Sequence, residues 1–456
     1  MQLNSRARFS ARLTVIVAGV LLQAGTAFAQ NGAVMQLTLS QAIDLALKQN
    51  RSLKLAQLDV VDNERKKEIA HAGYFPNLKN ESTAFHITEL QQVVIPAGSL
   101  QAPGIAGPIP ATTQIIGQGT FTAYTSGTGL RQPLTQMFKT HQENRAATAD
   151  IHSANEKLIE AENDVALKVR QLYYGILIAQ LKGEAAKAEA EAAQVKLQES
   201  TSSVLEGSAL EVVALDSRAA TLDAKQMVLK QSLQVRDLTF ELNNLLGLPL
   251  NTTLQLSEQA FVAPSSTTSR EECVRIAREQ SPDVRAAKQA VEKAKAGLEA
   301  AKYAYIPDLS VFARYSYQSG IPFLVHNFGT FGAIFEYELF DGGRRKAEIG
   351  AARTTLSKAE VNLDKVEEEV AVEVEIAYDN VEQMLTLVTV AEEVLKARTE
   401  GARLADSQFE QGAALASVRA EAAAKMSSAK ASLLEANVEL SLAQAELKRV
   451  MGELPR

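Results

Sequence analysis

Side chains that carry metal, redox or nucleophilic chemistry are few in this sequence, and they are scattered. Cysteine occurs once, as Cys273, which excludes a disulfide framework, a four-cysteine zinc site and a CxxC redox pair. No two histidines have the i, i+3 or i, i+4 spacing that lets two rings on one helix face share a metal; the five are His71, His86, His141, His152 and His326. No nucleophile, base and metal ligand converge. We therefore expect no enzyme activity, no cofactor and no metal site.

Two further candidates for chemistry favour structural interpretations. The Asp341–Arg344 segment reads DGGR and lies where a strand is expected to give way to a helix, a place that can bind phosphate. It lacks the GxGxxG and GxxxxGK spacings, so a turn is favoured. Cys273 shares the apolar side of its expected helix with Ile276 and Ala277, which favours a buried small side chain over a reactive thiol. The mild acidity of the chain, 47 basic against 54 acidic side chains, argues against a nucleic-acid partner.

The N-terminus has the layout of a secretory signal peptide. Three arginines precede an apolar run from Leu13 to Leu22, and an A-x-A cleavage site follows at Ala27–Ala29. We expect residues 1–29 to be removed, which changes the formal charge to −7 − 3 = −10. No cysteine follows the cleavage site directly, so no lipid anchor is expected. A retained membrane anchor is disfavoured, because the run is about half of the ~20 residues that span a bilayer.

Proline and aromatic residues divide the rest of the chain into helical and strand regions. Residues 134–248 and 323–454 contain no proline and are rich in Ala, Leu, Glu, Lys and Gln, which predicts very long helices. By contrast, 11 of the 25 aromatic residues lie between Tyr303 and Phe340. There, apolar residues alternate with polar ones with a period of two, which predicts a β-hairpin. These two strands alone suit a soluble sandwich, which they favour, or a membrane β-barrel with a wet interior.

The sequence is duplicated, and the duplication defines its organisation. Tyr74–Leu78 matches Tyr305–Leu309 at an offset of 231, whereas beyond the hairpins the offset falls to 205, as in Gly207 against Gly412. The difference of 26 residues must lie in the first hairpin, where residues 90–119 are rich in Gly, Pro and Thr and predict a long exposed loop. Each copy begins with a predicted capping box, at Thr38 and at Ser269.

We therefore divide the expected mature chain into two structural repeats of helices with one hairpin each. The first spans 30–268, with a hairpin at about 76–138, helices at 141–200 and 208–246, and a linker at 247–268. The second spans 269–456, with a hairpin at about 306–340 and helices at 344–406 and 413–451. Shorter helices precede each hairpin. Apolar residues repeat every seven positions along both long helices, which predicts coiled-coil packing; examples are Val165, Leu172 and Ala179, and Val370, Ala377 and Met384.

Strand counting indicates an oligomer. Four strands per chain cannot close a membrane barrel, which needs at least ~8 strands. Two or three copies would supply eight or twelve. A helix of about 60 residues is ~90 Å long at ~1.5 Å per residue. Such a chain could place its strands in the outer membrane and its helices across the periplasm.

The sequence resembles the outer-membrane efflux protein family typified by TolC. The resemblance rests on Leu37–Leu47, on Gln132–Leu134, on Phe340–Arg344, and on Pro76 and Pro307 at the strand starts. It implies an α+β membrane protein that assembles as a homotrimer, with a twelve-stranded β-barrel on a twelve-helix periplasmic α-barrel. The implied function is that of the exit duct of a tripartite efflux or type I secretion system. The implied partners are a periplasmic adaptor, an inner-membrane pump and outer-membrane lipid, and drugs, metals and polypeptides all remain open as cargo.

The resemblance also points to the ends of the helices farthest from the strands. Gly207 and Gly412 are expected in the turns there, because glycine accepts the positive φ that ends a helix. In the family this end is the closed gate and the adaptor-docking surface. Gly207 and Gly412 are therefore the candidate docking tips.

Two carboxylates are candidates for the gate. Asp216 and Glu421 each lie nine residues beyond one of the two tip glycines, and trimerisation would gather such carboxylates into a ring that favours cations and opposes tight closure. The alternative, a solvated helix face, is the more common meaning of such residues. The sequence departs from the family pattern at Val213 and Val418, where an acidic residue is frequent, so a double acidic ring is not expected.

Two other classes of protein remain as alternatives. A periplasmic adaptor also uses long helical hairpins, but it normally interrupts one hairpin with a lipoyl-like β-domain, which the sequence lacks. A secreted enzyme or coiled-coil scaffold lacks a set of catalytic residues. Fractionation separates these possibilities, because a channel is a trimer in the outer membrane and the alternatives are soluble in the periplasm.

Overall fold

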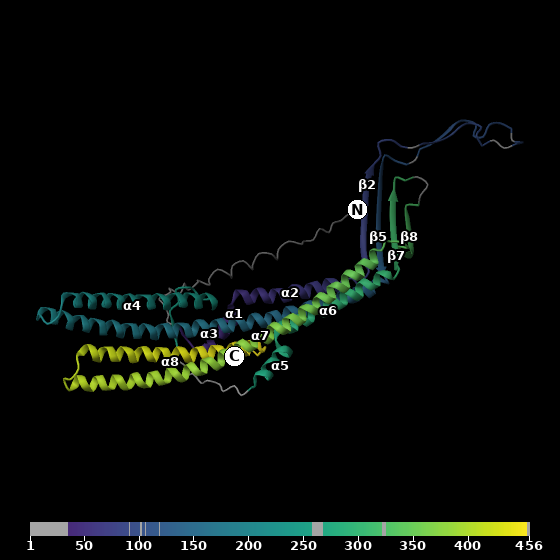
Figure 1. Cartoon of the computed structure of the whole chain (residues 1–456). Coiled ribbons are helices and arrows are strands. Elements are labelled where there is room, and N and C mark those ends of the chain that lie inside the picture. Colours follow the sequence, from purple (N-terminus) through teal and green to yellow (C-terminus); the bar gives the residue numbers. More distant parts are fainter. Residues whose placement is uncertain are drawn as a thin grey trace, which may run out of the picture.

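The computed structural model describes residues 35–453 apart from 91, 101–102, 105, 118, 258–267 and 322–324. The expected signal peptide lies outside the described residues. Long helices run side by side along most of the molecule, and strands rise from one end of them (Figure 1). The helices are α1 Leu39–Gln49, α2 Arg51–Ala72, α3 Gln136–Leu205, α4 Glu211–Leu245, α5 Arg270–Gln280, α6 Pro282–Lys302, α7 Arg344–Glu410 and α8 Ala416–Val450. The strands are β1 Met35–Leu37, β2 Asn77–His86, β3 Gln92–Ile95, β4 Gln114–Gly117, β5 Thr122–Pro133, β6 Leu254–Leu256, β7 Asp308–Ser319 and β8 Asn327–Glu336.

The two long helices are longer than the sequence predicts. α3 has 70 residues and α7 has 67, so each is ~100 Å long at ~1.5 Å per residue. α3 continues to Leu205. Within this extension the hydroxyls of Ser200 and Thr201 donate to the carbonyls of Lys196 and Leu197, four residues earlier in the same helix. α4 and α8 start later than residues 208 and 413, because the turns at the tips take up the intervening residues.

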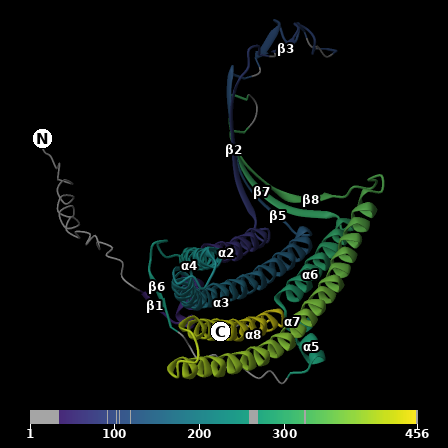
Figure 2. The same ribbon diagram turned by 60° about the vertical axis from the view of Figure 1, so that its left-hand side comes forward.

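The helices form a curved layer rather than a closed bundle (Figure 2). α3 packs against α4 and α8, and α7 packs against α8 and α6. The predicted heptad positions form the core: Val165, Val169, Leu172 and Ile176 on α3 are buried, as are Val370, Val374, Ala377 and Val381 on α7. Coiled-coil packing is thus the interaction that holds the layer together.

Of the two predicted capping boxes, the one at Thr38 is complete and the one at Ser269 forms only one of its two hydrogen bonds. At α1, the Thr38 hydroxyl accepts from the backbone N–H of Gln41, and the Gln41 side chain accepts from the N–H of Thr38. At α5, the Ser269 hydroxyl accepts from the N–H of Glu272. The carboxylate of Glu272 pairs instead with Arg275, at 2.6 Å. The second capping box is therefore incomplete, because a cation one turn away competes for the carboxylate.

One antiparallel sheet contains four strands in the order β2-β5-β7-β8. β5 pairs with β7, Thr128 lying opposite Tyr315, and so joins the two predicted hairpins into one sheet. β2 and β8 are the edges of this sheet. Within the described residues no second sheet packs on it, so these strands are not arranged as the sandwich that two of them favoured.

Two further pairs of strands were not predicted. β3 and β4 form a hairpin inside residues 90–119, which we expected to be a loop; the expectation was wrong because each strand has only four residues between segments rich in Gly and Pro. β1 and β6 form a short parallel pair. The Tyr173 hydroxyl lies 3.0 Å from the Leu37 carbonyl oxygen and 2.9 Å from that of Ser257, which fixes this pair to α3. Within the described residues no helix is long and apolar enough to cross a lipid bilayer.

Candidate gate and docking surface at the helix tips

The two helix hairpins end in turns of the same design. Gly207 follows α3 with φ +73°, and Gly412 follows α7 with φ +71°. The N–H of Ser208 donates to the Ser203 carbonyl at 2.9 Å, and the N–H of Ala413 donates to that of Gln408 at 2.8 Å. These bonds satisfy the last carbonyls of each helix, as in a Schellman motif. The sequence placed both glycines correctly in the turns, and their role in docking stays a prediction.

The two candidate gate carboxylates lie in different surroundings. Asp216 is exposed on α4 and makes no salt bridge with the described residues. Glu421 on α8 lies 2.6 Å from the Lys425 ammonium, one turn along the same helix. The hydrogen bond from Lys425 lowers the pKa of Glu421, and the charge of Lys196 on α3 acts in the same direction. Within one chain the two carboxylates are not brought together, because α3 lies between α4 and α8 (Figure 1).

The two valines that replace frequent acidic residues are solvent-facing. Val213 on α4 is 43% exposed and Val418 on α8 is 46% exposed. Each lies one turn from its tip, on the same helix as its carboxylate. Both hairpins therefore present an exposed valine, and not a carboxylate, at these matching positions.

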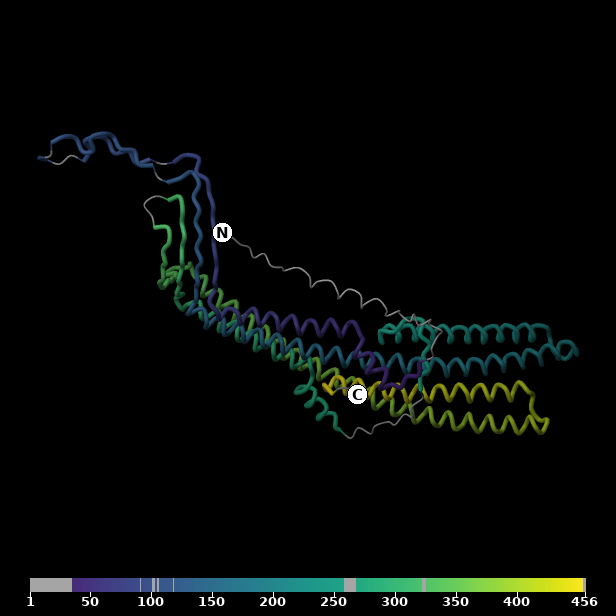
Figure 3. The backbone as a smooth tube through the Cα atoms, turned by 180° about the vertical axis from the view of Figure 1, so that it is seen from behind, coloured from purple at the N-terminus to yellow at the C-terminus, as the bar shows by residue number. Residues whose placement is uncertain are grey.

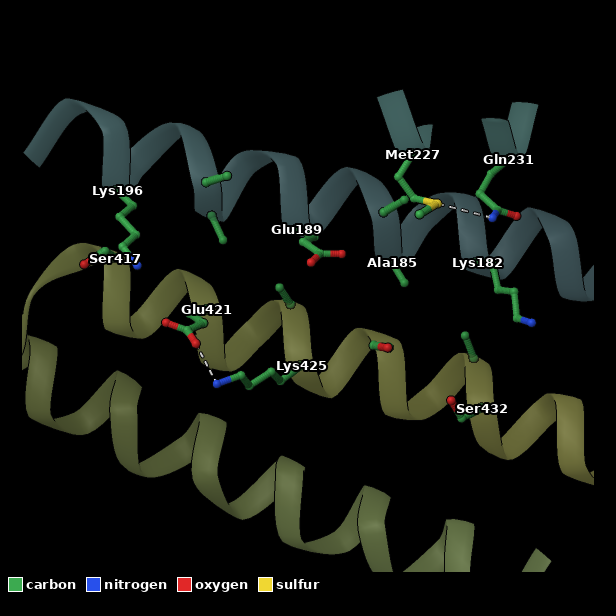
Figure 4. A pocket seen from close by; sticks show the side chains of 16 residues that line it. Lys182, Ala185, Glu189, Lys196, Met227, Gln231, Ser417, Glu421, Lys425 and Ser432 are labelled. Carbon is green, nitrogen blue, oxygen red and sulfur yellow. Dashed lines mark hydrogen bonds and ion pairs between the residues drawn. The ribbon is translucent and has the colours of Figure 1, made fainter. Parts of the chain in front are cut away.

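A groove of about 520 Å³ lies between α3, α4 and α8, close to the tips (Figure 4). Lys182, Glu189 and Lys196 line it from α3, and Glu421 and Lys425 line it from α8. Lys182 also pairs with Glu435 across the groove, at 2.7 Å. The groove is therefore lined by charged side chains of both signs and by small side chains, mainly alanines.

Sequence reasoning found Glu421 but missed the other residues of this groove. Lys182, Glu189 and Lys196 are spaced by seven, so a heptad count of charged residues on α3 would have placed them on one face. Glu199 was also missed. Its carboxylate accepts from the N–H of Ser417, at 2.9 Å, and so caps α8 from the neighbouring helix.

A second polar cluster lies away from the tips, where α3, α6, α7 and α8 meet. Burial raises the pKa of Glu160, Asp164 and Glu373 above the usual carboxyl range. Arg449 on α8 is the cation of this cluster, 3.4 Å from Asp164. The side-chain oxygen of Asn163, a residue that is 1% exposed, is buried there without a hydrogen-bond partner among the described residues.

Two other sequence candidates are structural. The Asp341 carboxylate accepts from the backbone N–H groups of Gly343 and Arg345 and pairs with the Arg345 guanidinium at 2.7 Å. These hydrogen bonds, first that of the guanidinium, lower the pKa of Asp341. The segment is therefore the expected turn, and it leads into α7. Cys273 is 1% exposed, and burial raises the pKa of its thiol, which agrees with a buried small side chain.

Part of this chain is similar in sequence to known proteins. Residues 273–453 match the family model described as "Outer membrane efflux protein". The resemblance to this family is thus confirmed. A segment of 127 residues is 30% identical to the outer membrane efflux protein BepC of Brucella suis, covering 28% of this chain and 28% of that protein.

Solved structures show the same fold along nearly the whole chain. The Campylobacter jejuni outer membrane channel CmeC aligns with a TM-score of 0.73 and 16% identity, over 92% of this chain and 87% of that one. The Vibrio cholerae outer membrane protein VceC aligns with a TM-score of 0.71 and 15% identity, over 91% of this chain and 96% of that one. At these identities the likeness establishes only that this chain shares the fold of these two proteins.

Proposed function

We propose that this protein is the outer-membrane channel of a tripartite efflux or type I secretion system. It conducts substrates passively from an inner-membrane pump and a periplasmic adaptor to the exterior. The observation that carries this proposal is a four-stranded sheet, open at both edges, at one end of helices ~100 Å long. The family match over residues 273–453 and the shared fold support it.

The open sheet argues for a homotrimer. A four-stranded sheet is too small to close on itself, whereas three copies supply twelve strands, enough for a barrel in the outer membrane. In this assembly the β2 edge of one copy pairs with the β8 edge of the next. Pairing would satisfy the backbone groups that both edges leave open.

The helices argue for a matching cylinder in the periplasm. α2 and α4 lie one after the other along α3, and α6 and α8 lie along α7, which gives four helical columns per chain (Figure 1). Three copies give twelve columns. The division of the chain into repeats 30–268 and 269–456 belongs to this proposal, because each repeat would contribute two strands and two columns to the shared cylinder.

The tips would then carry the gate and the adaptor contacts. Three copies place Asp216 and Glu421 around the end of the cylinder, with Val213 and Val418 nearer the turns at Gly207 and Gly412. The groove lined by Lys182, Glu189 and Lys196 is a suitable surface for a helical hairpin of the adaptor, because it offers charge of both signs along a helix face.

Fractionation and native mass spectrometry test the proposal. The protein is expected in detergent extracts of the outer membrane, with the mass of three chains, and channel recordings of this material should show ion conduction in lipid bilayers. Recovery as a soluble periplasmic monomer would instead support the adaptor or scaffold alternatives.

A further inference from the structure

The hairpin of β3 and β4, which we call the outer ribbon, has apolar side chains on both faces. Val93 lies opposite Ile116 and Val94 lies opposite Ile115 in its register. Successive residues of a strand point to opposite faces, so one pair covers each face. Val94 is 53% exposed and Ile115 is 62% exposed. A ribbon of this kind leaves apolar surface in water on two sides.

Among the described residues, no other strand pairs with the ribbon to cover these faces. β3 and β4 pair only with each other, and they lie beyond the outer end of β2 and β5, away from the remaining strands (Figure 3). Hydrogen bonds attach this segment to the four-stranded sheet at its base. There the N–H of Ile87 donates to the Phe121 carbonyl at 2.7 Å, and that of Thr120 donates to the Gly320 carbonyl at 3.1 Å. An isolated two-stranded ribbon is at best marginally stable in water, so this one needs a partner.

The composition of this region indicates what kind of partner fits. Residues 90–130 contain no Asp, Glu, Lys, Arg or His, although 22% of the whole chain is charged. An anionic lipid headgroup surface is recognised by Lys and Arg, which are absent here. Identical uncharged surfaces, in contrast, approach one another without repulsion between like charges.

We propose that the outer ribbon binds a second copy of this chain, so that the ribbons of adjacent copies pack on each other beyond the outer mouth of the barrel. This rests on the proposed trimer, which brings the copies together. The ribbon is adjacent in the chain to that interface, because β3 is the next strand after β2, the open edge that joins the next copy. Packing between ribbons would bury Val94 and Ile115 and extend the contact between copies beyond the sheet.

Cysteine cross-linking in intact cells tests this contact. Val93→Cys and Val94→Cys are made singly and test one face of the ribbon each. Both are made in a Cys273→Ala background, so that the engineered cysteine is the only thiol in the chain. Lys79→Cys is the matched control: it lies on the same β2–β3 arm, is exposed, and its copies would be held apart across the barrel. A short bis-maleimide is expected to give covalent dimers, the largest species that one thiol per chain allows, with a ribbon cysteine and none with Lys79→Cys.

Two results would overturn the proposal while leaving the trimer intact. In the first, native mass spectrometry shows three chains but neither ribbon cysteine cross-links more than Lys79→Cys. In the second, the ribbon cysteines resist a water-soluble maleimide without cross-linking, which would place the ribbon in lipid. Val94→Glu with Ile115→Glu gives an independent readout, because charge should lower the melting temperature of the trimer more than Gln92→Glu with Gln114→Glu does. Loss of the trimer in the unmodified protein would contradict the proposed function instead.

Discussion

At the scale of single residues, the two candidate gate carboxylates are unequal because only one has a cation beside it. Asp216 is exposed and unpaired among the described residues, whereas Glu421 is held by Lys425 at 2.6 Å. The sequence could place both nine residues from a glycine. It could not show the pairing, because a Lys four residues after a Glu is common on helices and forms a bond only in some surroundings.

This difference predicts unequal effects on ion selectivity. Asp216→Ala should weaken cation selectivity in bilayer recordings more than Glu421→Ala, because the charge of Glu421 is already balanced. Lys425→Ala should strengthen cation selectivity, and in that background Glu421→Ala should have an effect as large as that of Asp216→Ala. If the selectivity of all four variants equals that of the unmodified channel, these residues do not line the gate.

The carboxylates of the polar cluster around Arg449 predict a dependence of stability on pH. The pKa values of Glu160, Asp164 and Glu373 are raised by burial, so the folded protein holds these protons more tightly than the unfolded chain does. Their contribution to stability is therefore fully present below the ordinary carboxyl pKa and is lost as the pH rises through the raised folded-state values. Further acidic charge from Asp283 on α6, and from Glu369 and Glu446, opposes that of Lys157 and Arg449 in the same cluster.

Glu373→Gln isolates this effect. The variant should melt at a higher temperature than the unmodified protein at pH 7.5, and the difference should shrink as the pH falls, because the native carboxyl gains a proton as the pH passes through its raised pKa. Glu368→Gln, on the same helix but outside the polar cluster, is the control and should leave the difference near zero. A lower melting temperature of Glu373→Gln at pH 7.5 would show that the ionised carboxylate stabilises the junction.

At the scale of elements, the sequence predicted what depends on local pattern and missed what depends on tertiary context. The heptads of α3 and α7 and the strands β7 and β8 follow from periodicity and were found, and β2 and β5 were placed by the duplication of the sequence. The β3–β4 hairpin was missed because four-residue strands carry too little pattern. The β1–β6 pair was missed because Met35–Leu37 is a strand only through its pairing with Leu254–Leu256 and its contact with Tyr173.

The backbone conformation and the space around three glycines predict how much each Gly→Ala substitution changes stability. A Cβ at Gly207 would meet no atom within 4 Å, so Gly207→Ala should cost only the left-handed backbone conformation, about 1–2 kcal/mol. Gly452→Ala should cost more, because its Cβ would collide with the Gln280 carbonyl oxygen. Gly297→Ala, inside α6 with open space around it, should be stabilising by about 1 kcal/mol. Melting temperatures in the order Gly297→Ala, Gly207→Ala, Gly452→Ala are expected, and any other order would contradict this account of the turns.

At the scale of the whole molecule, one chain has the shape that the proposed trimer requires of each copy. Its helices form a curved layer and its sheet has two open edges (Figure 2). The sequence alone indicated several copies, because four strands are too few for a membrane barrel. It could not specify which edges meet, because strand order is set by the pairing of β5 with β7 across the two hairpins.

The pairing of β2 with β8 between copies is the most direct test. Ser82→Cys on β2 is combined with single cysteines scanned along β8 from Phe328 to Ile334, in a Cys273→Ala background, and oxidised in outer membranes. The account predicts that at least one position gives a ladder of covalent species that ends at three chains, while Ser82→Cys alone gives none. A scan that yields only monomers, or a ladder that continues beyond three chains, would contradict a barrel closed by three copies.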